Sequence, residues 1–360
     1  MKKTLLITLA SIALVSCSQD ETVATMDRAA IAFDKVFVAN STSARAAVDL
    51  TAENLRNFTV YGSVVKEQQK GNIFNNQLVS EQAGAYIYAP AQYWIPGADY
   101  HFTAIAPNTD AQWEYACREE DKSPYGTRQA HYGTITFDNA AAKAEQDLLW
   151  AYTPASTMQS IPDVVNFSFH HMLSRAKFTF VNDFAVGSNI SLKVKAVTIT
   201  DAHSEGTLQL QGTEQPAPQW TATGTTFSKL FGDAQYVKNA DGTLTRLGEK
   251  DVQAPQVAAS TDHYYLLPVA DATYQITFTI ELYQAGVHLQ TIQKSASVAM
   301  PSTMQRGFSY DLKAKLNASN VTNDGSLETI EFNVTGVDEW EDYLPPVDAN
   351  IATQTPGTNE

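Results

Sequence analysis

The chain has 360 residues, with 24 Lys and Arg against 39 Asp and Glu, and a formal net charge of −15. Such an acidic protein repels nucleic acid and anionic lipid headgroups, so neither is an expected partner. The length exceeds what one hydrophobic core usually serves, which predicts two domains.

The N-terminus predicts export. Lys2 and Lys3 precede an apolar run, Leu5 to Val15. This run is shorter than the roughly 20 residues that a membrane-spanning helix needs, so residues 1–16 resemble a secretory signal. The signal ends in Leu14-Val15-Ser16-Cys17, which resembles the lipobox of bacterial lipoproteins. We expect cleavage before Cys17 and acyl chains, palmitate among them, on its sulfur and new N-terminus. The alternative is an ordinary signal with an incidental cysteine.

A polar, acidic run follows the cysteine. Residues 18–21 read Ser-Gln-Asp-Glu, and we treat residues 17–28 as a lipidated acidic leash. The run resembles the surface-export signal of some Gram-negative lipoproteins, which sends them to the outer face of the outer membrane. The alternative is a solvated linker without a targeting role. The expected location is the cell outer membrane, exposed at the surface and held there by lipid.

The rest of the chain predicts an all-β fold. Short runs rich in β-branched and aromatic residues are separated by Gly, Pro, Asn and Asp. The Asp241-Gly242 pair, between two such runs, predicts a β-hairpin because a type I′ turn needs positive φ at both central residues. No sustained helical pattern appears, although residues 140–146 could form one or two turns. The expected strands are 57–65, 84–88, 100–105, 133–137, 166–181 (a pair), 191–200, 264–268, 274–283 and 329–337.

A change in pattern near residues 160–163 predicts a domain boundary. A polar loop precedes it, and a new alternating block begins at 166. We therefore expect an N-terminal β-sandwich domain over 29–162 and a C-terminal one over 163–343. Residues 344–360 have little apolar content and are expected to be a disordered tail.

The sequence contains no motif that indicates catalysis. It has no G-x-S-x-G elbow and no phosphate-binding glycine loop. Cys117 lies in an aromatic, strand-like run, which favours a buried thiol. His170 and His171 are adjacent in an expected strand, where neighbouring side chains point to opposite faces and cannot converge on one metal. We therefore expect no enzyme activity, no metal and no cofactor.

Several motifs occur in a fixed order and together resemble a known family. Each is an aromatic or apolar fragment that is weak alone, but their order and spacing cover nearly the whole mature chain. They resemble the fimbrillin-like (Mfa-like) family of type V pilin proteins. The motifs are Ile31-Ala-Phe33, Asn54-Leu-x-x-Phe58-x-Val-Tyr-Gly62, Tyr93-Trp94-x-Pro-Gly97, Asp147-Leu-Leu-Trp-Ala151, Val165-x-Phe-x-Phe169-x-His171, Tyr310-x-Leu312 and Val334-x-x-Val337-x-x-Trp340.

The resemblance implies two transthyretin-like β-sandwich domains in tandem and assembly outside the cell. In that family a trypsin-like protease cuts behind the first strand, and the matching bond here is Arg45-Ala46. The strand at 31–38 then leaves with the lipidated peptide, and a terminal strand of a neighbouring subunit fills the groove. The expected donor is 329–340, with Ile330, Phe332 and Val334 on one face.

The implied function is that of a structural and adhesive pilin-like subunit of a fimbrium. Its partners would be other pilin subunits, joined by β-strand addition, and host or bacterial surface ligands. The polar tail after Trp340 departs from the family pattern and leaves stalk, tip and anchor positions open. The alternative function is a monomeric surface lipoprotein that binds glycans, with Tyr93, Trp94 and Trp113 as a sugar-stacking platform.

Overall fold

The computed structural model describes residues 29–38, 50–67, 69–108, 112–120, 127–141, 146–211, 219–238, 244–246, 254–301, 304–322 and 329–339. Cys17, Arg45, Ala46 and the tail at 344–360 lie outside these residues. The described part is nearly all β, as the sequence predicts, and its one helix is α1 (Ala318–Val321). No helix within the described ranges is long and apolar enough to cross a membrane.

The N-terminal half forms a closed barrel with the strand order β1-β4-β3-β2-β5-β8-β9. Neighbouring strands are antiparallel except β1 and β9, which run parallel. The interior is filled by aromatic side chains such as Phe58, Phe102 and Phe167, all fully buried. The strands are β1 (Phe33–Val38), β2 (Asn57–Lys66), β3 (Gln69–Gln82), β4 (Ala85–Ile87), β5 (Asp99–Ala106), β8 (Leu149–Ser156) and β9 (Val165–His171).

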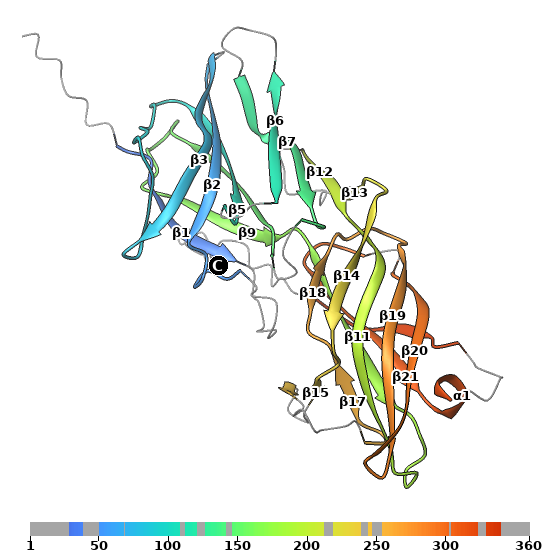
Figure 1. Ribbon diagram of the computed structural model, residues 1–360. Helices are drawn as coiled ribbons and strands as arrows, with labels where there is room; N and C mark the ends of the chain where they lie inside the picture. Colours follow the sequence, from blue (N-terminus) through green and yellow to red (C-terminus); the bar gives the residue numbers. More distant parts are fainter. Residues whose placement is uncertain are drawn as a thin grey trace, which may run out of the picture.

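The C-terminal half is a sandwich of two sheets (Figure 1). One has the order β16-β15-β17-β10-β21-β22, with β18 also on β10, and the other has the order β14-β11-β19-β20. Alternate residues of β19 point into the shared core, as the period of two requires. The strands are β10 (Ser174–Asn182), β11 (Ile190–His203), β14 (Thr226–Gly232), β15 (Tyr236–Lys238), β16 (Leu244–Arg246), β17 (Ala258–Ser260), β18 (Tyr264–Leu266), β19 (Thr273–Gln284), β20 (Val287–Ala299), β21 (Phe308–Leu316) and β22 (Phe332–Glu339).

A further sheet joins the two halves. Its order is β13-β12-β7-β6, so it combines β6 (Trp113–Glu120) and β7 (Thr127–Asp138) with β12 (Glu205–Gln211) and β13 (Trp220–Ala222). Its core also takes in Trp150 of the barrel and Tyr265 of the sandwich. Figure 1 shows this sheet between the barrel and the sandwich. The halves are therefore connected by packing as well as by the chain.

Strand pairing bears on the expected domain boundary and on the expected hairpin. The strand β9 lies beyond the expected boundary at 162/163, yet it pairs with β1 and β8 of the barrel. The strands β15 and β16 pair antiparallel, with Val237 opposite Thr245, which confirms the predicted hairpin. The turn residues of this hairpin lie outside the described residues. Of the expected helical turns at 140–146, residues 140 and 141 lie in a turn that begins at Asn139.

Candidate strand-exchange sites

The first strand of the barrel is held unequally by its two neighbours. Along one edge β1 pairs with β9, with Val36 opposite Phe167 and Val38 opposite Phe169. Along the other edge the register contains one pair, Phe33 with Tyr86 of β4. Few backbone hydrogen bonds therefore link β1 to β4, and side-chain burial must contribute much of the attachment.

Phe33 is the main side-chain anchor of β1. Its ring is buried and stacks on Phe167 with 5.5 Å between ring centroids and an interplanar angle of 24°. Such aromatic pairs contribute beyond the apolar area that they bury. The remaining rings around Phe33 are Phe58, Phe74, Tyr88 and Phe102, at centroid distances of 6.3, 5.6, 5.5 and 6.3 Å. Removing β1 would leave an aromatic groove in the barrel.

The residues just before β1 are fixed by backbone hydrogen bonds. The Ile31 amide donates to the Gln92 carbonyl at 2.8 Å, and the Val165 amide donates to the Ala32 carbonyl at 2.7 Å. The Tyr88 hydroxyl donates to the Ile31 carbonyl at 2.7 Å. Burial raises the pKa of the Tyr88 phenol, so it remains a donor at neutral pH. The segment from Ile31 to Phe33 is thus the firmly held part of the first strand.

The predicted donor strand occupies its own sheet in this structure. The strand β22 pairs antiparallel with β21, with Leu312 opposite Val334 and Ala314 opposite Phe332. The ring centroid of Phe332 lies 5.7 Å from that of Phe178 and 5.7 Å from that of Phe180, and both pairs are edge to face. Within the described residues β22 is the last strand of its sheet, so its second edge carries no partner strand.

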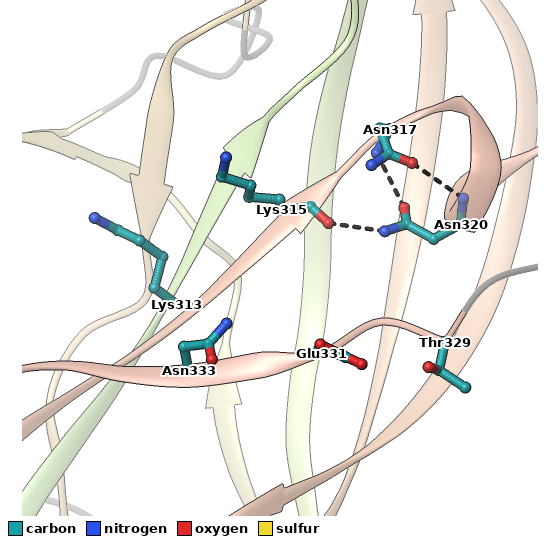
Figure 2. Close-up of a pocket in the computed structure, with 7 residues that line it drawn as sticks. All are labelled: Lys313, Lys315, Asn317, Asn320, Thr329, Glu331 and Asn333. Atoms are coloured by element: carbon teal, nitrogen blue, oxygen red, sulfur yellow. Dashed lines mark hydrogen bonds between the residues drawn. The ribbon is translucent and has the colours of Figure 1, made fainter.

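The two faces of the segment 330–334 differ in character. Ile330, Phe332 and Val334 share the inward face and pack on the sandwich core. The outward residues Glu331 and Asn333 line a pocket of about 680 Å³. Figure 2 shows this pocket, whose other lining residues are Lys313, Lys315, Asn317, Asn320 and Thr329. An apolar face opposite a polar face is the pattern that an inserting strand needs.

The histidine pair has a structural placement. His171 is fully buried, and its Nδ1 lies 2.7 Å from Oδ2 of Asp147. His170 is buried as well. The described residues contain no group of three or more His, Cys, Asp or Glu that could hold a metal ion. Cys117 is half-buried in β6, where the sequence favoured a buried thiol.

The three aromatic residues considered for sugar stacking do not form one surface. Trp94 is only 2% exposed and packs against Tyr100 in the barrel core, with 4.7 Å between ring centroids. Trp113 is half-buried, and its Nε1 donates to the Pro107 carbonyl at 2.8 Å. Only Tyr93 of the three is exposed. A flat platform for stacking needs at least two exposed rings, so this set does not supply one.

Comparison with known proteins identifies the family. The profile of the fimbrillin-like family matches residues 44–335, most of the chain. No curated protein matches it. The crystal structure of a fimbrial protein from Bacteroides vulgatus ATCC 8482 is similar in fold, with a TM-score of 0.57 and 15% identity over 86% of this chain and 99% of that one.

A more distant likeness is to a "putative cell adhesion protein" from Bacteroides uniformis ATCC 8492, with a TM-score of 0.41 and 14% identity over 88% of this chain and 99% of that one. The chain belongs to the fimbrillin-like family. This membership confirms the resemblance seen in the sequence. It points to a pilin-like protein of the cell surface, structural in role, with other pilin subunits as its partners.

Proposed function

We propose that the protein is a fimbrial subunit that is exported as a lipoprotein, cut after Arg45 and polymerised by donor-strand exchange. In this scheme the lipid on Cys17 holds the precursor at the outer membrane. Cleavage of Arg45-Ala46 separates β1 from the rest of the barrel, and β1 then leaves with the lipidated peptide. A strand from a second subunit enters the vacated groove.

The observation that carries the proposal is the attachment of β1. This strand is covalently continuous with the lipidated leash on one side and with the segment containing Arg45 on the other. It has one pair with β4, and the buried side chains that hold it are Phe33 and, just before the strand, Ile31. After the cut, β1 would be held by non-covalent contacts alone, so it could be exchanged for another apolar strand.

The proposed donor is β22, through Ile330, Phe332 and Val334. These side chains alternate with polar residues, as an inserting strand requires. Three buried apolar side chains contribute roughly 1.5–3 kcal/mol each, in addition to a ladder of backbone hydrogen bonds. Because β22 is paired with β21 of its own subunit, it must separate from β21 before it can enter the groove of another subunit. This step would restrict exchange to subunits that are being assembled.

N-terminal sequencing of the protein recovered from cell surfaces tests the proposal. The expected first residue is Ala46 in the assembled form, with Cys17→Ser leaving unprocessed precursor. A chain that keeps a blocked, acylated Cys17 and runs as a monomer would instead support a lipid-anchored protein that does not polymerise. The burial of Trp94 gives the glycan-binding alternative no platform, so we do not favour it.

A further inference from the structure

The pocket on the outer face of the sandwich has no part in the proposed strand exchange. Its volume of about 680 Å³ lies within the range of small-molecule sites. Among the described residues, only lysine, asparagine, threonine and glutamate line it, and their side-chain stems add carbon surface between the polar groups. Figure 2 shows the lysines along β21 and the residues Glu331 and Asn333 along β22. Such a lining suits a ligand that carries both polar groups and C–H faces.

Two lysines of β21 give one side of the pocket a positive charge. Lys313 and Lys315 alternate with buried apolar residues, so both point away from the core. Among the residues that the structure describes, Lys313 forms no ion pair. The Lys315 Nζ lies 3.9 Å from Oδ2 of Asp183, and its side chain is 68% exposed. An ion pair this long and exposed contributes little, so both lysines are available to an anionic group.

The facing strand supplies groups that bind hydroxyls. Asn333 is directly opposite Lys313 in the register of β22 and β21, and the exposed Glu331 precedes it by two residues. A carboxylate at this position opposes the binding of phosphate or another densely charged anion, because like charges repel. It accepts hydrogen bonds from hydroxyl groups, however, and the Asn333 carboxamide both donates and accepts them.

Two asparagines hold the end of the pocket in a fixed shape. The Asn317 Oδ1 accepts from the backbone amides of Ser319 and Asn320 at 3.0 and 3.2 Å. The Asn320 Oδ1 accepts from the Asn317 amide at 3.0 Å, and its Nδ2 donates to the Lys315 carbonyl at 2.9 Å. Figure 2 shows the bonds that join Asn317, Asn320 and Lys315. Because this end is already ordered, the Asn317 Nδ2 can donate to a ligand at little cost in side-chain freedom.

From these groups we propose that the pocket binds an acidic saccharide, a glycan that carries uronic acid. The sugar carboxylate pairs with Lys313 and Lys315. The sugar hydroxyls bond Glu331, Asn333 and the Asn317 Nδ2. An acidic peptide fits less well, because the described lining has no aromatic or aliphatic residue to receive a hydrophobic anchor. The site relies on charge and hydrogen bonds, so it needs no aromatic platform.

The pocket is complete only while β22 is paired with β21, since each strand supplies part of its lining. If β22 is the donor, a condition that rests on the function proposed above, its transfer to a neighbour dismantles the pocket. The subunit that keeps its own β22, at one end of a fibre, is then the one that binds the saccharide. Binding by the uncut chain does not depend on strand exchange.

Calorimetric titration of the uncut chain with digalacturonate tests the proposal. We expect saturable binding by the wild type that is at least about tenfold weaker in Lys313→Gln, which removes one charge-assisted contact. The matched control is Lys66→Gln, an equal change of charge at the exposed end of β2, and it should bind like the wild type. Methyl-esterified digalacturonate keeps the shape but loses the charge, so it should also bind at least about tenfold more weakly.

Equal affinity of the wild type and Lys313→Gln, or no binding of digalacturonate by the wild type, would overturn the site. Inorganic phosphate or a tetraglutamate peptide that binds as tightly as digalacturonate would overturn the assignment to a saccharide. Trypsin-generated polymer tests the restriction to fibre ends separately, and it should bind far less digalacturonate per chain than the uncut protein. Polymer that binds as much per chain as the uncut protein would overturn that restriction and the donor role of β22, while the pocket itself would stand.

Discussion

The Asp147 carboxylate lies 2.7 Å from Nδ1 of His171, and both side chains are fully buried. Asp147 stands just before β8, and His171 is the last residue of β9, where the chain leaves the barrel. The Asp147 Oδ1 accepts from the Leu148 amide at 2.8 Å, and the next carbonyl after His171, that of Met172, accepts from Trp220 Nε1 of the connecting sheet at 2.6 Å. The pair therefore fixes the point at which barrel, connecting sheet and sandwich meet.

Replacing Asp147 should destabilise this meeting point strongly. Asp147→Asn removes the charge but keeps the volume, and it leaves a buried imidazole with a poorer partner. We expect the free energy of unfolding to fall by about 2 kcal/mol or more. The matched control is Glu281→Gln, which breaks a pair with the half-exposed Lys195 and should cost less than about 1 kcal/mol. Urea denaturation measures both, and equal losses would contradict a special role for the buried pair.

The two phenylalanines of β1 should differ in their effect on stability. Phe33→Ala empties the centre of the aromatic cluster and should cost about 3–5 kcal/mol. Phe37 is 50% exposed, so Phe37→Ala should change the free energy of unfolding by at most about 0.5 kcal/mol. Denaturant midpoints of the uncut chain give the comparison. If the two variants unfold alike, Phe33 does not anchor the strand.

Acid should destabilise the fold through its histidines. Burial lowers the pKa of His101 and of His203, and burial together with Arg175 and Lys177 holds the pKa of His263 well below its usual range. In the folded protein these groups stay neutral to a lower pH than in the unfolded chain, so unfolding is accompanied by proton uptake once the pH falls below about 6.5. The unfolded state then binds more protons, so the free energy of unfolding decreases as the pH falls below that value.

The histidine contribution can be isolated by substitution at position 263. Urea midpoints of the wild type at about pH 7.5 and about pH 5.5 should differ more than those of His263→Gln, because the variant lacks one group that takes up a proton on unfolding. His288→Gln is the control, since His288 lies on the exposed β20 and hydrogen-bonds Thr291 on the surface. A pH dependence that is unchanged in His263→Gln would show that other groups cause the loss.

Much of the fold could be predicted from the sequence because half-buried strands alternate clearly. The run 57–65 lies within β2, 274–283 lies within β19, and the expected pair at 166–181 corresponds to β9 and β10. These strands each bury one face or both, so their apolar residues recur at short intervals. The alternation of apolar and polar residues was therefore sufficient to predict strands in which buried residues recur regularly.

Some of the strands that were not predicted have weak patterns. Only two residues of β3 and two residues of β20 are buried, so neither strand has a clear apolar face. The strand β8 continues to Ser156 through Pro154, a residue that usually demotes a strand. Pro154 is tolerated because only Leu149 and Trp150 of β8 pair with β9, so the edge of β8 that faces β9 has no strand pairing at Pro154.

The candidate sites depend on long-range contacts that the sequence does not reveal. The alternation at 330–334 predicted which side chains share a face, but not that β22 fills its own sheet.

The central claim, assembly after a cut at Arg45, predicts a specific response to limited trypsin treatment. The folded precursor should lose residues 17–45 and give ladders on unboiled gel electrophoresis. Arg45→Ala should stay monomeric. The matched control is Arg56→Ala, at the start of β2, where Arg56 bonds Glu81 at 3.2 Å on the surface, and this variant should polymerise like the wild type.

The most direct single measurement is therefore the gel of trypsin-treated wild type beside trypsin-treated Arg45→Ala. We expect a ladder for the first protein and a single monomer band for the second, with the ladder subunits beginning at Ala46. Ladders of equal strength in both lanes, or a wild type that is cut at Arg45 and remains monomeric, would contradict it.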